Sequence, residues 1–386
     1  MPRTARTRLL AMLLLAAGAR AGVLPDDRAD FMYHRYEGGG ITVQGPSILV
    51  RKKIGDSLSA TANYYSDFIS SASIDVVVSG ASPYREHREQ KSLSLDYLRG
   101  KSTWTAGYLT SQENDYKSDT WSLGVSQDMF GDLTTVSFGY SQGLDHVSST
   151  TRPDFHDEVQ RRDYRFGITQ VLTRNLLGSL NYEAITEQGD LQNPYRSIRY
   201  CQPVCTGSPG DTYAFAPEVF PRTRTSNAAA LRLKYFLPWR ASLQGQYRFY
   251  TDTWGIQAHT GELEYTHPWG PRWVFSGSYR FSTQNSADFF SDLFPYQNAQ
   301  NFMARDRAYS ALTSSTIGLG AAYEFPVGWA SWLKRGTANL HVDRMSIDYG
   351  EFRDLRNSPP GTSQAGTEPL YSYSASILQF YLSFWF

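Results

Sequence analysis

Asp145, His146 and Ser148 are the residues in this sequence whose types come closest to a set for covalent catalysis. A serine becomes a nucleophile when a histidine accepts its proton and a third group orients the histidine. Residues one or two positions apart in a chain are no evidence for that geometry, and no donors to an oxyanion can be named nearby. We therefore expect a solvated loop start here. No catalytic residues are predicted, and the chain is not expected to be an enzyme.

Cys201 and Cys205 are the only two cysteines. An oxidising compartment outside the cytoplasm favours their pairing, which would close a small ring in a long loop. A metal site is the alternative interpretation. Two thiolates without a nearby histidine or a second cysteine pair fall short of the usual tetrahedral set. We predict a disulfide, no metal and no other cofactor.

A third set of residues could act on solutes. These charged or titratable side chains alternate with large apolar ones along the chain. A charge on the lipid side of a barrel near mid-bilayer costs about 2–4 kcal/mol, so these residues belong in the lumen if the apolar face meets lipid. Opposed charges in a water-filled lumen sort ions and small polar solutes. The predicted lumen residues are Arg165, Glu183, Arg232, Lys234, Arg248, Glu262, Glu264, Arg280, Glu324, His341 and Asp343.

The same charges have a second interpretation, in which ion pairs staple a narrow or plugged barrel. We favour the pore, because a barrel of about 16 strands is wide enough to leave a channel unless something fills it. The apolar segment Ser73–Val78 lies in a predicted outer loop. It could fold inward as a constriction, or it could extend a strand above the membrane, which is the interpretation we favour.

The elements that must position these residues are strands with two unlike faces. Trp121–Gln127, Val136–Ser141 and Trp273–Phe281 alternate large apolar with small or polar residues, and the pattern continues along almost the whole chain. Short turns, such as the one at Gly55-Asp56, are separated by long polar stretches, which is the plan of a membrane barrel. The predicted long loops are about Ser66–Arg88, Leu144–Glu158, Gly189–Arg222, Asn285–Tyr309 and Gly350–Pro369.

The composition agrees with such a wall. Aromatic residues make up 15% of the chain, its mean hydropathy is −0.44, and no apolar stretch after the N-terminus is long enough for a membrane helix. A soluble β-sandwich shares part of this signature, so the alternation decides. Counting from about Arg28–Tyr36 to Leu370–Phe386 gives roughly 16 strands, with 14 or 18 also possible. We predict an all-β fold, a closed antiparallel transmembrane β-barrel.

The N-terminus has the pattern of a cleaved secretory signal peptide over residues 1–21. Three arginines precede the apolar run Leu9–Ala17, and the triplet Ala19-Arg20-Ala21 follows it. The run is too short for a permanent helical anchor. Removing four arginines and no acid leaves 33 basic against 37 acidic residues, about −4, so nucleic acid is not an expected partner. Residues 22–386 are predicted to form a single barrel domain.

The C-terminal strand is the most specific local feature. Phe380, Leu382, Phe384 and the final Phe386 fall on one face. Such a strand resembles the signal that outer-membrane barrels present to the barrel-assembly machinery. The alternative is an ordinary amphipathic last strand. Expected partners are this machinery during biogenesis and outer-membrane lipid, while the oligomeric state is not predicted.

Several motifs also resemble one bacterial family. They include Tyr33–Gly40, Gly45–Lys52, Ser71–Val76 and Asp288–Phe294, and further matches lie between them. The sequence resembles the family called domain of unknown function 3570, a group of uncharacterised outer-membrane β-barrel proteins, over nearly the whole mature chain. The resemblance implies the barrel and an outer-membrane location, and it implies no reaction, ligand or partner. The segment from Cys201 to Cys205 lies outside its pattern.

The expected function is porin-like passage of small polar solutes or ions across the outer membrane of a Gram-negative bacterium. The alternative is an occluded barrel that serves as a surface or assembly scaffold and binds a partner through its outer loops. A barrel enzyme is a third and more distant interpretation. The sequence predicts neither the solute nor the gating.

Overall fold

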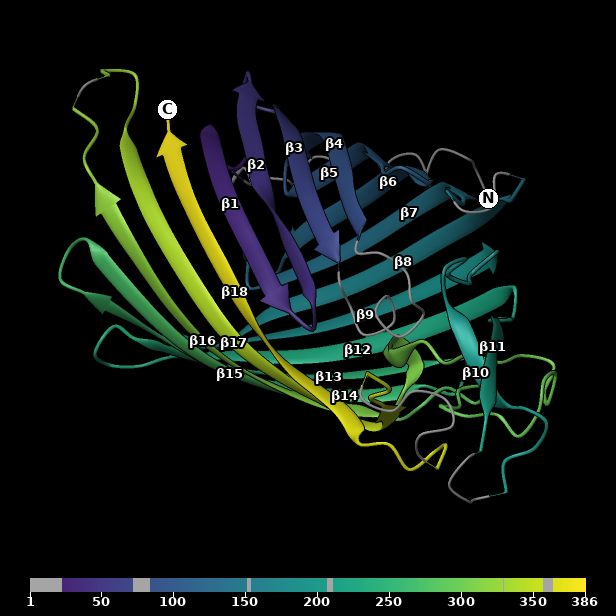
Figure 1. The fold of residues 1–386 in the computed structure, drawn as a ribbon. Helices are drawn as coiled ribbons and strands as arrows, with labels where there is room; N and C mark the ends of the chain where they lie inside the picture. The colour runs from purple at the N-terminus through teal and green to yellow at the C-terminus, as the bar shows by residue number, and fades with distance from the viewer. Residues whose placement is uncertain (1–22, 72–83, 151–153, 207–210, 329, 357–363) are drawn as a thin grey trace, which may run out of the picture.

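Sixteen strands of the described chain close into one antiparallel barrel (Figure 1). The computed structural model describes residues 23–71, 84–150, 154–206, 211–328, 330–356 and 364–386. The predicted signal peptide and the segment Ser73–Val78 lie outside these residues. No helix among the described residues is long and apolar enough to cross a membrane.

The strands follow chain order around the barrel, and β1 pairs with β18 to close it. Only β10 and β11 leave this order and form a separate two-stranded sheet, so β9 pairs directly with β12. A single 3-10 turn, η1, spans Arg307–Tyr309. The barrel strands are β1 Arg28–Gly38, β2 Ile41–Ile54, β3 Leu58–Ser71, β4 Tyr84–Arg99, β5 Ser102–Gln112, β6 Tyr116–Met129, β7 Thr134–Ser148, β8 His156–Thr173, β9 Leu176–Gly189, β12 Thr223–Phe236, β13 Ser242–Asp252, β14 Gln257–Trp269, β15 Trp273–Gln284, β16 Leu312–Phe325, β17 Arg335–Arg353 and β18 Leu370–Trp385; the separate pair is β10 Ser197–Cys201 and β11 Tyr213–Pro217.

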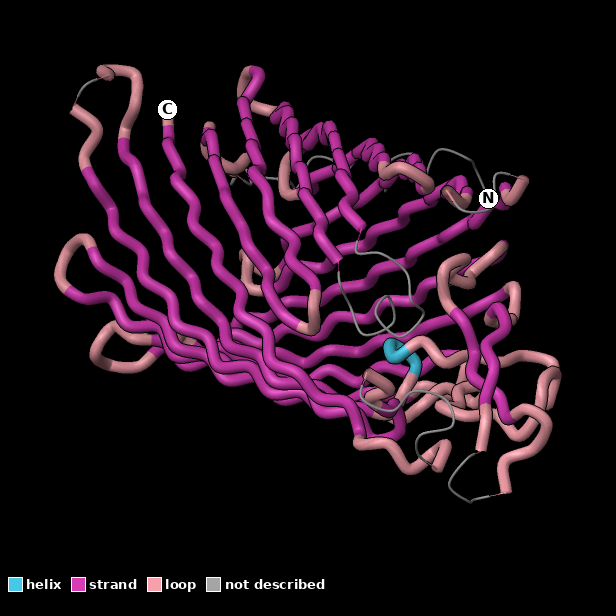
Figure 2. Tube along the Cα trace, in the orientation of Figure 1, coloured by secondary structure: helices cyan, strands magenta, loops and turns pink. Residues whose placement is uncertain are grey.

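The two ends of the barrel differ, as predicted (Figure 2). We call the end where β1 starts and β18 finishes the turn end, and the opposite end the loop end. Most turn-end connections are tight, whereas residues 190–222, 285–311 and 354–369 form long connections at the loop end. The loop end also has tight turns, such as the one between β1 and β2, where Gly39 and Gly40 have φ of 58° and 77°, a conformation that glycine adopts readily.

Two predicted loops are too long. β3 continues to Ser71 and β4 begins at Tyr84, inside the predicted loop 66–88. Likewise β7 continues to Ser148 and β8 begins at His156, inside the predicted loop 144–158. Above the membrane both faces of a strand meet water, so the apolar alternation that identifies a strand fades while its backbone ladder continues.

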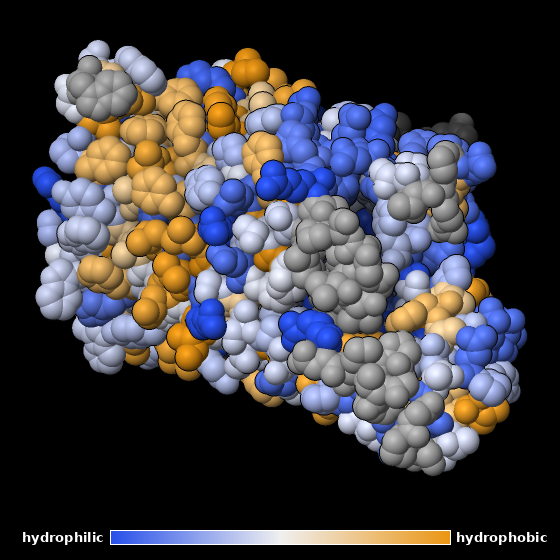
Figure 3. Space-filling view, in the orientation of Figure 1, coloured by the Kyte–Doolittle hydropathy of each residue, from blue (hydrophilic) through white to orange (hydrophobic). Residues whose placement is uncertain are grey.

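The outward face of the wall is an apolar belt. Leu180 pairs with Leu231, and both are about half exposed in the isolated chain. Residues two positions away, such as Tyr182 and Leu233, share that face because side chains alternate along a strand. Figure 3 shows other apolar side chains of the belt gathered over β17, β18 and β1. Exposed apolar area on this scale is the surface that a bilayer covers.

The compact hydrophobic clusters of the described residues lie at the loop end, in the long connections and in the adjoining ends of β17 and β18. One cluster joins Phe220, Trp254 and Phe289, and a second joins Tyr349, Phe352 and Tyr371. A third cluster, which includes Ile198 and Phe294, packs beside β10. The described residues of the three long connections therefore pack together as a body, which we call the loop cap; it comprises residues 190–206, 211–222, 285–311, 354–356 and 364–369.

Candidate functional site

The predicted lumen residues all lie on the face opposite the apolar belt. On β13, Tyr247 is 50% exposed and faces outward, so the adjacent Arg248 faces inward. Arg248 pairs with Ala230 and Thr260, and the same register sets the faces of the neighbouring strands. By this register the remaining residues, Arg165, Glu183, Arg232, Lys234, Glu262, Glu264, Arg280, Glu324, His341 and Asp343, also face inward.

Several of these inward side chains are exposed. The side chains of Arg165, Arg280 and Glu324 are 65%, 53% and 50% exposed. A side chain that points into a closed barrel and is still accessible must border open space within the wall. None of these three side chains belongs to a buried apolar cluster of the described residues. The described wall therefore borders open, polar space at these positions.

The structure brings part of the set together. Glu183 lies between two arginines, with its Oε1 atom 3.1 Å from Nε of Arg165 and its Oε2 atom 4.0 Å from a terminal nitrogen of Arg248. Arg280 lies 3.5 Å from Glu262 on the next strand. The other predicted lumen residues lie apart from this cluster. His341 contacts Asp343 at 3.0 Å, Glu324 contacts Arg335 at 3.2 Å, and Arg232 donates to Gln246 at 2.8 Å. Among the described residues, no carboxylate forms an ion pair with Lys234 and no cation forms one with Glu264.

The opposite wall has a different chemistry, which the sequence interpretation missed. Leu95, Trp104, Leu123 and Phe138 mark the outward face of β4 to β7. Apart from Leu109 and Asp96, which accepts a hydrogen bond from Thr105 at 2.7 Å, the inward positions in the middle of these strands carry small hydroxyl side chains or glycine. The alternation of apolar and polar residues marks these positions as inward, but their small side chains give no sign of a role in the sequence. The hydroxyl wall comprises Ser92, Ser94, Thr103, Thr105, Gly107, Ser122, Gly124, Ser126, Ser137, Gly139 and Ser141.

The loop cap is held by a buried ionic network. Arg199 on β10 is completely buried and contacts Glu368 at 2.6 Å and also Asp292. Asp292 in turn lies 2.9 Å from Arg305. The network joins all three long connections, and each charge has an opposite partner, as a buried ion requires. Burial acts to raise the pKa of Glu368, but the Arg199 guanidinium outweighs it and holds that pKa below its usual value.

A second buried carboxylate anchors the cap. One oxygen of Glu218 accepts hydrogen bonds from the backbone N–H groups of Arg305 and Asp306, both at 2.7 Å. Burial, reinforced by the carboxylate of Asp306, raises the pKa of Glu218 to about 8, although those two N–H groups oppose the shift. The protonation state of this residue therefore changes near neutral pH.

The cap reaches the lumen side of the wall. The guanidinium of Arg307 lies 5.9 and 5.6 Å from the rings of Tyr371 and Tyr373, which face inward on β18. Two residues later, the ring of Tyr309 lies 5.8 Å from the guanidinium of Arg224, which faces inward on β12. The segment with η1 thus lies inside the rim between β12 and β18. No pattern in the sequence predicted this inward course.

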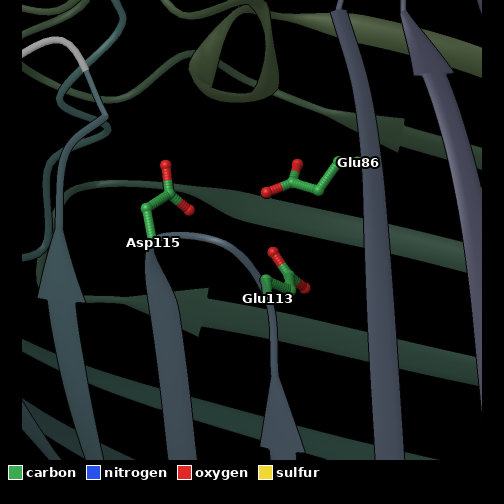
Figure 4. A group of neighbouring side chains, drawn as sticks. All are labelled: Glu86, Glu113 and Asp115. Atoms are coloured by element: carbon green, nitrogen blue, oxygen red, sulfur yellow. The ribbon is translucent and has the colours of Figure 1, made fainter.

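Three carboxylates converge at the rim on the other side (Figure 4). Glu86 extends from β4, while Glu113 and Asp115 belong to the turn between β5 and β6. One ligand oxygen from each lies within 4.8 Å of the others, and carboxylate oxygens are the donors that Ca²⁺ prefers. Arg88 lies 4.0 Å from Glu113, and burial raises the pKa of Glu113. The sequence analysis predicted no metal site and did not identify this group.

This acidic group borders a hollow of about 420 Å³ in the rim between β5 and β8. Glu113, Asp115, Asp157 and Glu158 line it together with His146 and other polar residues. The hollow is polar and contains more acids than bases. Its negative charge attracts cations to this part of the rim.

The residues considered for covalent catalysis are separated by the wall. Asp145 faces inward, where it accepts hydrogen bonds from Ser118 at 2.5 Å and from Tyr116. His146 and Ser148 are one and three positions further along the strand, so both face outward. His146 contacts Glu158 at 3.4 Å. These three residues do not form a nucleophile, base and acid set.

The other predicted residues lie as follows. Cys201 and Cys205 form a disulfide in the loop cap. Phe380, Leu382 and Phe384 face outward on β18, and the Phe386 ring lies 6.0 Å from Trp332 and 5.0 Å from the ammonium of Lys52.

A family model described as "Protein of unknown function (DUF3570)" matches residues 74–164 and 149–335. The chain belongs to this family. No curated protein matches the sequence. The DUF3570 chain is similar to solved outer-membrane barrels, among them the siderophore receptor PirA from Pseudomonas aeruginosa, with 8% identity, coverage of 93% of this chain and 81% of that one, and a TM-score of 0.43.

Two further solved structures are of the same kind. OmpT of Vibrio cholerae has 10% identity, coverage of 95% of this chain and 100% of that one, and a TM-score of 0.42. A Pseudomonas aeruginosa FadL homologue has 11% identity, coverage of 94% and 90%, and a TM-score of 0.42. These likenesses concern the fold. The strand order and pairing of the DUF3570 chain themselves make it an all-β, closed antiparallel barrel, and the likenesses assign no cargo to it.

Proposed function

We propose that this DUF3570 protein is a porin-like channel in the outer membrane of a Gram-negative bacterium, passing small polar solutes or ions. The observation that supports the proposal is the exposure of inward charges. Arg165, Arg280 and Glu324 are at least half exposed although a closed wall surrounds them. Such groups border water, and a water-filled barrel with charged walls conducts small solutes and discriminates among them by charge.

Near the loop end the inward pair of Arg224 and Asp252 is largely desolvated, whereas the paired charges nearer the middle of the lumen keep water contact, which supports a channel over a stapled barrel. Stapling ion pairs would be desolvated, as Arg199 and Glu368 are in the loop cap, where both side chains are fully buried. The pair of Arg280 and Glu262 is 3.5 Å apart and keeps water contact. Pairs of that kind contribute little stability, typically up to about 1 kcal/mol. The presence of such weak ion pairs in the lumen is better explained by an effect on solutes than by a contribution to stability.

The loop cap is expected to narrow the mouth. Arg307 and Tyr309 lie on the lumen side of the rim, between β12 and β18. We therefore expect solutes to pass nearer the hydroxyl wall of β4 to β7 than the wall beneath the cap. No catalytic step is part of this proposal.

A scaffold that binds a partner through the loops is the second candidate. The packed core and ion pairs of the described cap residues favour it, because a folded loop surface suits recognition. The two candidates differ in conductance. Purified protein inserted into a planar bilayer should give stable single-channel steps, and liposomes containing it should swell in small sugars. Verified insertion with no steps and no swelling would refute the channel and favour the scaffold.

A further inference from the structure

The edge of the apolar belt at the loop end carries cations on four strands. On β17 the exposed apolar residues end at Val342, and the next outward residue is Arg344. On β8 they end at Tyr164, and the next outward residue is Arg162. In the same way, toward the loop end, Arg35 is the next outward residue beyond Tyr33 on β1 and Lys91 is the next outward residue beyond Leu93 on β4. Each of these four side chains is the first outward residue beyond the exposed apolar residues of its own strand.

Two of the four have a carboxylate partner on their own strand. Arg35 contacts Glu37 at 2.8 Å and donates to Gln44 at 3.0 Å. Lys91 contacts Glu89 at 3.3 Å. Both acids are the next outward residues toward the loop end. These cations therefore bring their own counter-charge to the membrane edge.

Arg344 and Arg162 differ from them. Arg344 donates to the hydroxyl of Ser376 at 2.8 Å, and within the described chain no carboxylate forms an ion pair with it. Arg162 likewise has no ion pair with any described residue, and its cross-strand neighbours are the neutral Gln142 and Thr186. Both arginines are exposed. Each keeps most of its guanidinium donors directed to the surroundings.

We propose that Arg344 and Arg162 each bind the phosphate of a lipid headgroup on the loop side of the membrane. A charge at the edge of hydrocarbon is costly without a counter-ion, and the phosphates of the adjoining lipids lie at that depth. The planar guanidinium matches two phosphate oxygens at once. The hydroxyl of Ser376 is a neutral donor beside Arg344, and the amide of Gln142 can donate beside Arg162. Seven strand-to-strand steps separate β8 from β17, so the two sites are independent.

Native mass spectrometry of the detergent-solubilised full barrel, titrated with phosphatidic acid, tests the proposal. A basic residue near a lipid surface contributes about 1 kcal/mol, so R344S and R162S should each weaken binding at their site about five-fold. The matched control is R35Q/E37Q, which removes a guanidinium of the same kind at an equivalent place together with its internal partner. Phosphatidic acid should bind this control as it binds the wild type.

Two results would overturn the proposal. One is wild-type binding of phosphatidic acid by the R344S/R162S double variant, with the barrel shown to be folded by its heat-modifiable migration. The other is equal protection of the barrel against thermal unfolding by inorganic phosphate alone, which would assign the arginines to a free anion. This test does not measure conductance, so its outcome for the lipid-binding proposal is independent of whether the protein is a channel.

Discussion

Replacing Arg248 and Arg280 with serine should make the channel more cation-selective while leaving the barrel stable. Both side chains face inward, and they lie on β13 and β15 with β14 between them. The double variant makes this part of the lumen two charges more negative. Serine matches the hydroxyl side chains that already line the opposite wall.

The size of the shift follows from Coulomb's law with screening. At about 10 Å in water, a unit charge changes the electrostatic energy of a permeating monovalent ion by about 0.4 kcal/mol. Screening with a Debye length of about 8 Å at 0.15 M salt reduces this energy to about 0.1 kcal/mol. Losing two positive charges lowers the energy of a cation and raises that of an anion by the same amount. Together these changes raise the ratio of cation to anion permeability about two-fold. At 0.01 M salt the Debye length is about 30 Å, and the same calculation gives about an eight-fold rise.

The effect on stability should be small. Arg280 is 53% exposed at 3.5 Å from Glu262, and Arg248 is 37% exposed at 4.0 Å from Glu183. Exposed pairs of this kind contribute about 0–1 kcal/mol each. The benchmark is R199S, which leaves the buried Glu368 without its cation and Asp292 with Arg305 alone, and should destabilise the loop cap by about 3–5 kcal/mol.

The assay is reversal potential across a planar bilayer under a salt gradient, at high and low salt, with thermal unfolding of the same preparations. A rise in cation preference that grows as salt falls agrees with the calculation. An unchanged reversal potential in the double variant refutes the assignment of these arginines to the conducting path. A large drop in unfolding temperature, with no conductance in wild type or variant, would instead support the stapled barrel.

Three further predictions concern assembly, the disulfide and pH. Deleting Phe386, or replacing it with serine, should leave export intact but lower the yield of heat-modifiable barrel in the outer membrane; equal yields would show that the terminal ring is no assembly signal. Cys201 and Cys205 should resist thiol labelling in protein isolated without reductant, and replacing both with serine should spare the barrel, because so small a ring removes little unfolded-state entropy; full labelling of the native protein would contradict the bridge. Glu218 has a folded pKa of about 8 against an ordinary value of 4.5, so its contribution to cap stability is complete at acid pH and is lost as pH rises from 4.5 through 8. The E218Q variant should therefore show slower hydrogen exchange than the wild type at residues 305–306 at pH 8, and little difference at pH 5. Equal exchange of the two proteins at pH 8 would refute this prediction.

The wall of the barrel was predictable because each strand is amphipathic on its own. Strand number, closure and the face of residues such as Arg248 and Glu262 all follow from the alternation of apolar and polar residues. Lipid on one side and water on the other impose that pattern locally, so no knowledge of distant residues is needed. The first strand, predicted at about Arg28–Tyr36, pairs along its full length with β18.

The loop cap was not predictable from the same signal. Arg199, Asp292 and Glu368 come from three connections, and nothing local marks any of them as buried. The acidic group of Glu86, Glu113 and Asp115 is hidden for the same reason, since β4 and the turn after β5 approach only in the folded wall. Contacts set by closure of the barrel leave no periodic trace in the sequence.

The ionic network of the cap also implies an order of events during folding. Arg199 and Glu368 are 169 residues apart in the chain, and Glu368 immediately precedes the final strand. Until β17 and β18 have paired, the buried guanidinium has Asp292 but lacks Glu368, its second carboxylate partner. The ionic network of the cap is therefore completed only after the last hairpin of the wall has formed. A complete network thus reports that β17 and β18 are paired.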